Sequence, residues 1–270
     1  MPRRADCADS DVHGQDLQVT APVADLLRSP EGGIERQVLF GHEFRVFETK
    51  ARDGFACGQV KSDGYMGYVD RSALGPVHAV THKITALSTH LYSLPDMKSP
   101  THGNLPFAAR INVIAQSGDY LTLFGGRYVP RQHVGTIDTF EDDYVRVMEN
   151  FLGIPYLWGG NSTRGMDCSG AVQLALQACN TPCPRNSHKQ EESLGRQLEP
   201  GAGLQRGDLI FWKGHVGVMV DDSNIIHANA THMAVALEPL DIASKRIAAT
   251  QTGDITSIRR VPLSGVSQPV

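Results

Sequence analysis

The hydrophobic pattern divides the chain into a β-rich N-terminal half and a C-terminal half that mixes helices and strands. Short apolar runs alternate with glycine-containing turns over residues 37–75 and 82–134, a pattern that predicts strands joined by tight turns. Further on the spacing becomes helical, because Val145, Met148 and Leu152 recur at steps of three and four residues. We therefore expect two small all-β units followed by an α+β domain.

The two β-rich segments share a short sequence, which indicates that they are copies of one unit. Tyr68-Val69-Asp70-Arg71 precedes Gly75 in the first segment, and Tyr128-Val129-Pro130-Arg131 precedes Gly135 in the second. Two units of this size resemble bacterial SH3 domains, small barrels that position or recognise a ligand. A packing role without ligand binding stays open, since a fold alone does not assign a function.

Three helices and four strands are predicted in the last part of the chain. Residues 139–152 are expected to form a helix capped by Thr139, and residues 167–179 are apolar nearly all round, which is typical of a central helix. A third helix is expected from Ser187, with Gln190 completing a capping box. The predicted strands lie at 208–212, 216–220, 224–227 and 255–261. The expected boundaries are a polar tail over 1–30, SH3-like units over 31–78 and 79–137, and the α+β domain over 138–270.

Composition limits the classes of binding partner and the cellular compartment that are expected for this protein. The net charge of the 270 residues is -4, so no basic field favours a nucleic acid or an anionic membrane as the main partner. The first residues lack the apolar run of a secretory signal, and no stretch reaches the roughly 20 apolar residues that span a bilayer. A cytoplasmic location is expected. Five cysteines without framework spacing predict reduced thiols.

A candidate nucleophile lies in Asp167-Cys168-Ser169-Gly170, which opens the predicted central helix. Backbone N–H groups are unpaired at a helix N-terminus and the helix dipole is positive there, so a thiolate is stabilised and the thiol pKa should fall. Asp167 is expected to cap the helix, and the N–H of Cys168 to contribute to an oxyanion hole. A small buried core cysteine is the alternative reading.

Two histidines are candidates for the base and for the group that orients it. His215 begins one predicted strand between glycines, and His227 lies in the next strand. If Met219 pairs with Ile225, Gly217 lies opposite His227, and His215 is one diagonal step away on the same face. A ring nitrogen of His227 can then hold His215 in the tautomer that accepts the thiol proton. A satisfied core histidine is the alternative for His227.

Zinc bound by Cys168, His215 and His227 is a further alternative, but the sequence lacks the usual motifs of zinc sites. It has no His-Glu-x-x-His, no Cys-x-x-Cys pair, and no histidine pair at finger spacing beside Cys179 and Cys183. We therefore expect no metal and no cofactor.

Five separated motifs occur in order within residues 140–262: Phe151-Leu152-Gly153-Ile154-Pro155-Tyr156-Leu157-Trp158-Gly159-Gly160, Asp167-Cys168-Ser169-Gly170, Pro184-Arg185-Asn186-Ser187, Arg206-Gly207-Asp208-Leu209-Ile210-Phe211 and Gly214-His215-Val216-Gly217. Together they resemble the NlpC-type cysteine peptidases of bacterial cell-wall peptides. The resemblance implies an α+β, papain-like cysteine peptidase domain preceded by two small all-β SH3-like barrels. It also implies that Cys168 is the nucleophile, His215 the general base and His227 the orienting third residue.

The SH3-like units add a resemblance to the γ-D-glutamyl-L-diamino acid endopeptidases of murein peptides. It implies cleavage of the γ-D-glutamyl to L-diamino acid bond in murein tri- or tetrapeptides that have a free N-terminal L-alanine. It also implies an ammonium site at Asp167, with Tyr156 nearby and Tyr65 or Tyr68 contributed by the first SH3-like unit. The candidate donors to the D-glutamate carboxylate are Arg185, Ser187 and Ser169. For the arginine, a plain surface charge is the alternative.

A peptidase of this kind inside the cell would meet imported wall fragments, so a role in cell-wall peptide recycling is expected. Two other functions stay open: a non-catalytic wall-peptide-binding SH3 protein, and a thiol amidase or acyltransferase on the same scaffold. The sequence leaves undecided the oligomeric state, the preference between tri- and tetrapeptides, and whether the diamino acid is diaminopimelate or lysine.

Overall fold

The computed structural model describes residues 14–47 and 54–262, and the chain divides between Thr139 and Phe140 into two compact units. The first unit is built of strands, and the second combines strands with α-helices, as the change of hydrophobic period predicted.

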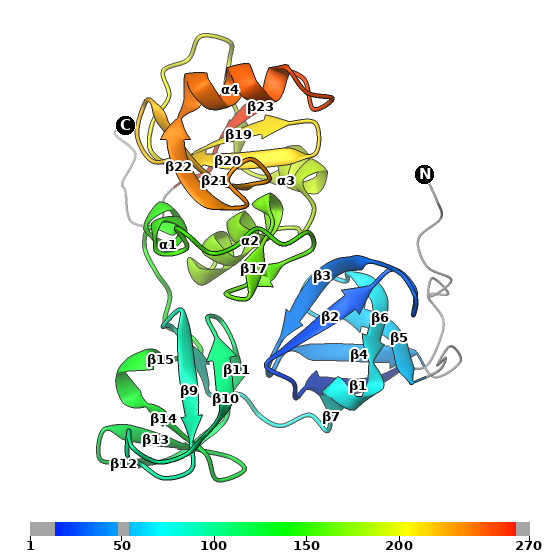
Figure 1. Ribbon diagram of the computed structural model, residues 1–270, viewed down its shortest axis with the longest axis vertical. Helices are drawn as coiled ribbons and strands as arrows, with labels where there is room; N and C mark the ends of the chain where they lie inside the picture. Colours follow the sequence, from blue (N-terminus) through cyan, green and yellow to red (C-terminus); the bar gives the residue numbers. More distant parts are fainter. Residues whose placement is uncertain (1–13, 48–53, 263–270) are drawn as a thin grey trace. The chain divides into compact units, whose positions relative to one another are not determined.

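A curved antiparallel sheet forms the first half of unit 1 (Figure 1). Its spatial order is β3-β2-β6-β5-β4-β1-β7, and its core is a cluster of alternating apolar side chains that includes Leu26, Phe44 and Val69. The strands are β1 Gly14–Val19, β2 Val23–Leu27, β3 Ile34–Leu39, β4 Glu43–Phe47, β5 Phe55–Val60, β6 Met66–Asp70 and β7 Leu74–Gly75.

The predicted polar tail over 1–30 is wrong for its second half. Strands β1 and β2 both belong to the first sheet, where β1 pairs with β4 and β2 pairs with β3 and β6. Polar Gln15, Asp16 and Gln18 mask the alternation, but Leu17 and Val19 are buried in the core. The first barrel therefore begins by Gly14 among the described residues, and residues 1–13 lie outside them.

The second half of unit 1 contains a five-stranded sheet, β10-β9-β14-β13-β12, and a three-stranded sheet, β11-β8-β15. The shared sequence of the two halves has one structure: β6 and β14 each run into a 3-10 turn, Arg71–Ala73 or Arg131–His133, and then into a further strand. The strands are β8 His82–Ile84, β9 Ser88–Tyr92, β10 Thr101–Pro106, β11 Arg110–Ile111, β12 Val113–Ser117, β13 Tyr120–Leu123, β14 Tyr128–Pro130 and β15 Val134–Thr136.

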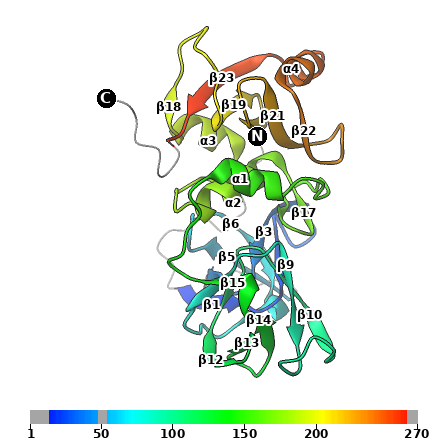
Figure 2. The ribbon, with the colours of Figure 1, turned by 90° about the vertical axis from the view of Figure 1, so that its left-hand side faces the viewer.

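Unit 2 is a six-stranded sheet, β18-β23-β19-β20-β21-β22, with helices on both faces. Helix α2 lies against one face near β20 and β21, and α4 covers the other (Figures 1 and 2). The elements are α1 Tyr144–Asn150, β16 Asn161–Ser162, β17 Gly165–Met166, α2 Cys168–Ala178, α3 Ser187–Ser193, β18 Arg196–Gln197, β19 Asp208–Trp212, β20 His215–Met219, β21 Asn224–Asn229, β22 Ala234–Pro239, α4 Leu240–Ala248 and β23 Ile255–Arg260.

The central helix confirms the sequence-based prediction, and the following hairpin has the register on which the expected placement of the two histidines depended. Helix α2 begins directly after its cap Asp167, and most of its residues are buried. In the antiparallel pair β20 and β21, Met219 lies opposite Ile225 and Val218 opposite Ile226. That register directs the two histidines of these strands toward the same face.

Two predicted helix caps are wrong, and strand β22 and helix α4 are among the elements of unit 2 that were not predicted. Helix α1 is capped by Asp143, which accepts hydrogen bonds from the N–H groups of Val145 and Arg146, and Thr139 lies outside the helix. The cap of α3 is Asn186, without a side-chain hydrogen bond, so the expected capping box from Ser187 does not form. Strand β22 and helix α4 were missed because Pro239 separates two short segments whose polar residues obscure their periods.

The cysteines in the described part of the chain divide into two states. Cys168, Cys179 and Cys183 are buried thiols outside any disulfide, as expected. Cys57, fully buried on β5, is disulfide-bonded, so the expectation of reduced thiols is wrong for this residue.

Within residues 14–47 and 54–262, no helix has both the length and the apolar character needed to cross a bilayer.

Asp143 joins the start of α1 to the loop before β19. It caps the helix, and its Oδ2 accepts from Arg206 Nη2 at 2.8 Å, while Arg206 also pairs with Glu149 at 2.8 Å. Asp143→Ala should therefore lower the free energy of unfolding of unit 2 by about 1–2 kcal/mol. Urea unfolding followed by tryptophan fluorescence measures this selectively, because both tryptophans, Trp158 and Trp212, lie in unit 2.

The matched control is Asp142→Ala. This neighbouring side chain is 73% exposed and forms an ion pair with Arg146 on the surface, so its loss should change the unfolding free energy by less than about 0.5 kcal/mol. Equal destabilisation by both variants would contradict the capping role of Asp143.

Candidate active site

Cys168 is the first residue of α2, and its position follows from the cap before it. Asp167 has extended backbone angles, and its Oδ1 accepts from the N–H of Gly170 at 2.7 Å, which fixes the first turn. The thiol is 8% exposed and lies beside the backbone N–H of Val216, the residue after His215. The nucleophile candidate is therefore brought next to the strand that carries the base candidate.

The resting charge of this thiol differs from the expectation. Burial, reinforced by the Asp167 carboxylate, raises the pKa of Cys168 to about 12, and the Val216 amide and Arg185 oppose this only in part. The expected fall in pKa is thus wrong for the substrate-free molecule, because loss of hydration outweighs the helix terminus. Burial likewise lowers the pKa of His215 to about 3, and His227 and Arg246 act in the same direction. Both groups are neutral at rest.

The two histidines meet as the register requires. His215 Nε2 and His227 Nδ1 are 2.7 Å apart, with His215 partly exposed and His227 fully buried. Because Nε2 of His215 is engaged in this contact, Nδ1 is the ring nitrogen left to receive a proton from a thiol. In the described part of the chain no hydrogen bond joins Cys168 Sγ to the His215 ring. Such contacts commonly tighten only when substrate binds.

Asp167 lies at the centre of a buried polar cluster. The Arg185 guanidinium forms a bidentate ion pair with it, in which Nη1 donates to Oδ1 at 2.9 Å and Nη2 donates to Oδ2 at 2.6 Å. The arginine side chain is only 2% exposed. Ser169 Oγ donates to Oδ1 at 3.3 Å and accepts from Arg185 Nη1 at 2.9 Å, and the N–H of Gly159 donates to Oδ2 at 2.9 Å. Arg185 is therefore a buried partner of Asp167 rather than a surface charge.

The remaining predicted site residues divide between the two units. Tyr156 is half-buried near the thiol, and burial, with Cys168 and Asp167 adding to it, raises the pKa of Tyr156 to about 12. Ser187 begins α3 and is partly buried. In unit 1, Tyr65 is half-buried and its hydroxyl donates to Glu35 Oε2 at 3.1 Å. Tyr68 is buried inside its own barrel, so Tyr65 is the tyrosine of this pair that a ligand can reach.

Sequence reasoning missed two residues that adjoin the histidines. Glu238 on β22 lies 2.7 Å from His227 Nε2, and Arg246 on α4 holds the other side of that carboxylate. Ala236 pairs with His227, so Glu238 lies two residues along the same face of the neighbouring strand. The alternation of β22 was the available sequence signal, but it becomes useful only when the pairing of β21 with β22 is known.

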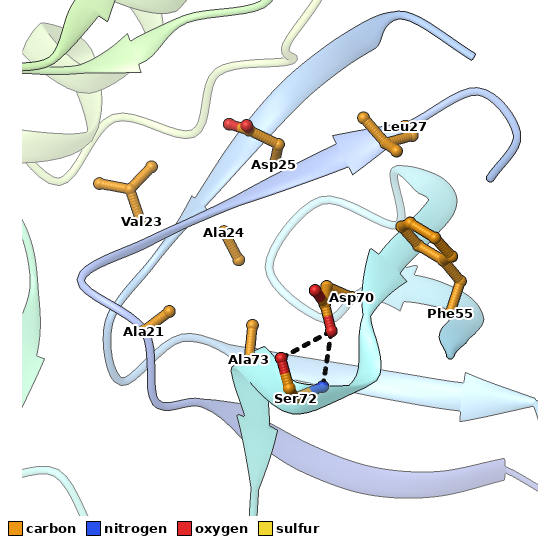
Figure 3. Close-up of a pocket in the computed structure, with 9 residues that line it drawn as sticks. All are labelled: Ala21, Val23, Ala24, Asp25, Leu27, Phe55, Asp70, Ser72 and Ala73. Carbon is orange, nitrogen blue, oxygen red and sulfur yellow. Dashed lines mark hydrogen bonds between the residues drawn. The ribbon is translucent and has the colours of Figure 1, made fainter. Parts of the chain in front are cut away.

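A separate pocket lies on the first barrel of unit 1 (Figure 3). Its volume is about 410 Å³, and Asp25 and Asp70 are its charged side chains. Asp70 is bonded to the N–H and hydroxyl of Ser72, at 2.8 and 2.7 Å. The lining residues are Ala21, Val23, Ala24, Asp25, Leu27, Phe55, Asp70, Ser72 and Ala73. None is a thiol or an imidazole, so the pocket does not contain the predicted chemistry.

Comparison with known proteins gives matches to both units. Residues 153–252 match the NlpC/P60 family, and residues 26–74 match the bacterial dipeptidyl-peptidase SH3 domain. The chain is 28% identical over 228 residues to the γ-D-glutamyl-L-lysine dipeptidyl-peptidase of Bacillus subtilis, covering 76% of this chain and 75% of that relative. It is 34% identical over 92 residues to the probable endopeptidase NlpC of Escherichia coli, covering 31% of this chain and 58% of that relative.

A solved structure supports the fold of both units. The crystal structure of an NlpC/P60 family protein from Bacillus cereus superposes with a TM-score of 0.75 at 20% identity, covering 92% of this chain and all of that one. At this identity the likeness establishes the fold. It agrees with the α+β peptidase domain and the β-rich N-terminal part expected from the sequence.

The match to the NlpC/P60 family identifies unit 2 as a cysteine peptidase domain of papain-like fold. More narrowly, the chain carries an NlpC/P60 domain with a bacterial SH3 domain ahead of it.

The raised thiol pKa predicts how Cys168 reacts before substrate binds. A pKa of about 12 keeps the thiol protonated at neutral pH, so alkylation by iodoacetamide should be slow at pH 7 and still accelerating above pH 9. Mass spectrometry with fragmentation distinguishes Cys168 from Cys179 and Cys183, and glutathione provides the unburied reference. A rate that levels off between pH 6 and 7 would reveal a preformed thiolate and contradict the burial argument.

Proposed function

We propose that the chain hydrolyses the γ-D-glutamyl to L-diamino acid bond of murein tri- or tetrapeptides that have a free N-terminal L-alanine. The observation that carries this proposal is the extent of the match to the Bacillus subtilis dipeptidyl-peptidase. The 228 aligned residues cover 76% of this chain, so they include more than the peptidase domain alone. The likeness of the SH3 domain to those of bacterial dipeptidyl-peptidases gives further support.

In the proposed reaction Cys168 Sγ attacks the carbonyl carbon while His215 Nδ1 takes the thiol proton. Because thiol and imidazole are neutral at rest, this transfer accompanies the attack and does not precede it. The N–H of Cys168, at the start of α2, supports the oxyanion of the tetrahedral intermediate. Protonated His215 then gives its proton to the leaving amine, and water hydrolyses the thioester.

Recognition of the substrate is proposed to involve the cluster around Asp167. Its side chain is 12% exposed, and the free ammonium of L-alanine would approach its carboxylate, with Tyr156 nearby. Both terminal nitrogens of the Arg185 guanidinium already donate hydrogen bonds to Asp167. A substrate carboxylate bound by Arg185 must therefore compete with that ion pair, whereas Ser169 and Ser187 offer hydroxyl donors.

A role in wall-peptide recycling is also proposed, whereas one observation speaks against the cytoplasmic location that was expected from the sequence. The disulfide at Cys57 favours an oxidising compartment, because such bonds rarely persist in the reducing cytoplasm. The proposed chemistry does not depend on the compartment, since free wall peptides of this kind provide the same bond in either place.

Removal of the nucleophile should abolish turnover. For Cys168→Ala we expect kcat to fall by a factor of about 10⁶ on L-Ala-γ-D-Glu-meso-diaminopimelate, with products identified by mass spectrometry. Cys179→Ala is the matched control, because it removes another free buried thiol at the other end of the same helix. Cleavage retained by Cys168→Ala would instead favour a non-catalytic binder contaminated by another peptidase.

The ammonium site gives a second expectation. Acetylation of the L-alanine amine removes its positive charge and adds bulk, so kcat/KM should fall by about 10²-fold or more, which corresponds to the loss of one buried charged contact. The comparison uses the same peptide with and without the acetyl group. Equal cleavage of both peptides would contradict recognition of a free amine, while leaving the thiol chemistry intact.

A further inference from the structure

The series of hydrogen bonds behind the nucleophile does not end at His227, the predicted third residue. His227 Nε2 and Glu238 Oε1 are 2.7 Å apart, so the imidazole has a partner on each nitrogen. Arg246 Nη1 donates to Glu238 Oε2 at 2.6 Å and Nη2 donates to Oε1 at 2.6 Å. Strands β20, β21 and β22 and helix α4 thus each contribute one side chain to a continuous sequence of hydrogen bonds.

Burial makes the direction of these hydrogen bonds consequential. His227 is fully buried and Glu238 is 8% exposed, so neither ring nitrogen of His227 can exchange its partner for bulk water. A neutral imidazole has one donor nitrogen and one acceptor nitrogen. The partner that bonds Nε2 of His227 therefore decides what Nδ1 offers to His215.

The charge of Glu238 determines whether this side chain donates or accepts in the series of hydrogen bonds. The Arg246 guanidinium, aided by His227, holds the pKa of Glu238 well below its usual range against the opposing effect of burial. The other titratable group facing the carboxylate is His232, whose Nδ1 is 3.9 Å from Oε1 and whose side chain is 40% exposed. An ionised carboxylate only accepts hydrogen bonds, so the hydrogen between it and His227 belongs to Nε2.

We propose that Glu238, fixed by the two arms of Arg246, is a positioning residue that sets the tautomers of both histidines. With the hydrogen on His227 Nε2, Nδ1 of that ring is an acceptor and takes the Nε2 hydrogen of His215. His215 Nδ1 is then unprotonated and free to receive the thiol proton. This inference rests on the proposed roles of Cys168 and His215.

The proton balance of the step is simple. The S–H bond of Cys168 breaks, and an N–H bond forms at His215 Nδ1. The sulfur electron pair forms the bond to the carbonyl carbon, and the π pair of the C=O bond moves to the oxygen, which becomes the oxyanion. The imidazolium keeps its Nε2 hydrogen bonded to His227, and no proton moves to Glu238. The carboxylate acts through His227 and has no contact with the reacting atoms.

The decisive measurement is the tautomer of His227 in the full-length wild-type protein. Two-bond ¹H–¹⁵N correlation spectra assign the protonated nitrogen of each histidine, and His227→Gln identifies the resonances. We expect His227 protonated at Nε2 and His215 also protonated at Nε2. A His227 protonated at Nδ1 in the wild type would overturn the proposal without recourse to further variants.

Two substitutions test the cause. Glu238→Leu removes the acceptor, and Glu238→Gln supplies an amide that can donate as well as accept, so both should convert the single tautomer into a mixture or the reverse form. The expected loss in kcat/KM is about 10²- to 10³-fold, below the roughly 10⁴-fold loss seen where a carboxylate contacts the catalytic histidine directly. Unchanged tautomers and unchanged turnover in Glu238→Gln would overturn the proposal even if Glu238→Leu failed to fold.

A matched control separates positioning from plain stability. Asp208 is a fully buried carboxylate of the same sheet that pairs with Arg260 at 2.7 Å and, among residues 14–47 and 54–262, has no histidine partner. Asp208→Asn should lower stability and leave the histidine tautomers as in the wild type; a tautomer change there equal to that in Glu238→Gln would count against the inference. Because the spectra need no substrate, failure of the proposed substrate does not affect them.

Discussion

The carboxylate of Asp167 is the constraint on which the active site depends. It caps α2 through Gly170, anchors the preceding loop through Gly159 and binds both arms of Arg185, so three segments are fixed by one side chain. Cys168 follows directly in the chain and inherits that placement. Charge stabilisation of a resting thiolate is not what this arrangement provides, because burial and the same carboxylate raise the thiol pKa.

The active site carries almost no net charge in the absence of substrate. The thiol and the His215 imidazole are neutral, and the two carboxylates nearest to them are each matched by an arginine, Asp167 by Arg185 and Glu238 by Arg246. A buried unpaired charge would be costly, whereas paired groups with further hydrogen bonds are tolerated. Separated charge then develops only during the attack, when substrate also occupies the site. Neutrality at rest thus makes His215, and its tautomer, more important than a low thiol pKa.

The sequence predicted those features that depend on local patterns. The apolar helix after Asp167 was predicted from its hydrophobic pattern, and the structure confirms it. For the following hairpin, the pairing of Met219 with Ile225 was one possible register, and the structure has this register. Strand β1 was missed because its polar positions dominate its composition. The effect of burial on Cys168 could not be anticipated, since hydration depends on residues that pack from distant segments. Glu238 was not predicted as a site residue for a related reason. Its role depends on the register between β21 and β22, and neither β22 nor α4 had been predicted.

The choice of histidine as the third residue explains why the chain of hydrogen bonds extends as far as it does. A carboxylate or an amide in that place could orient His215 and end there, but an imidazole has a second nitrogen that also needs a partner when buried. Glu238 supplies that partner, and its own buried charge in turn needs a counterion. Arg246 supplies it from a side chain that is 28% exposed and so remains partly hydrated. Each buried polar group therefore requires a further partner, until the series of hydrogen bonds reaches solvent at Arg246. Loss of any one of these hydrogen bonds changes the protonation of the His215 nitrogen that faces the thiol.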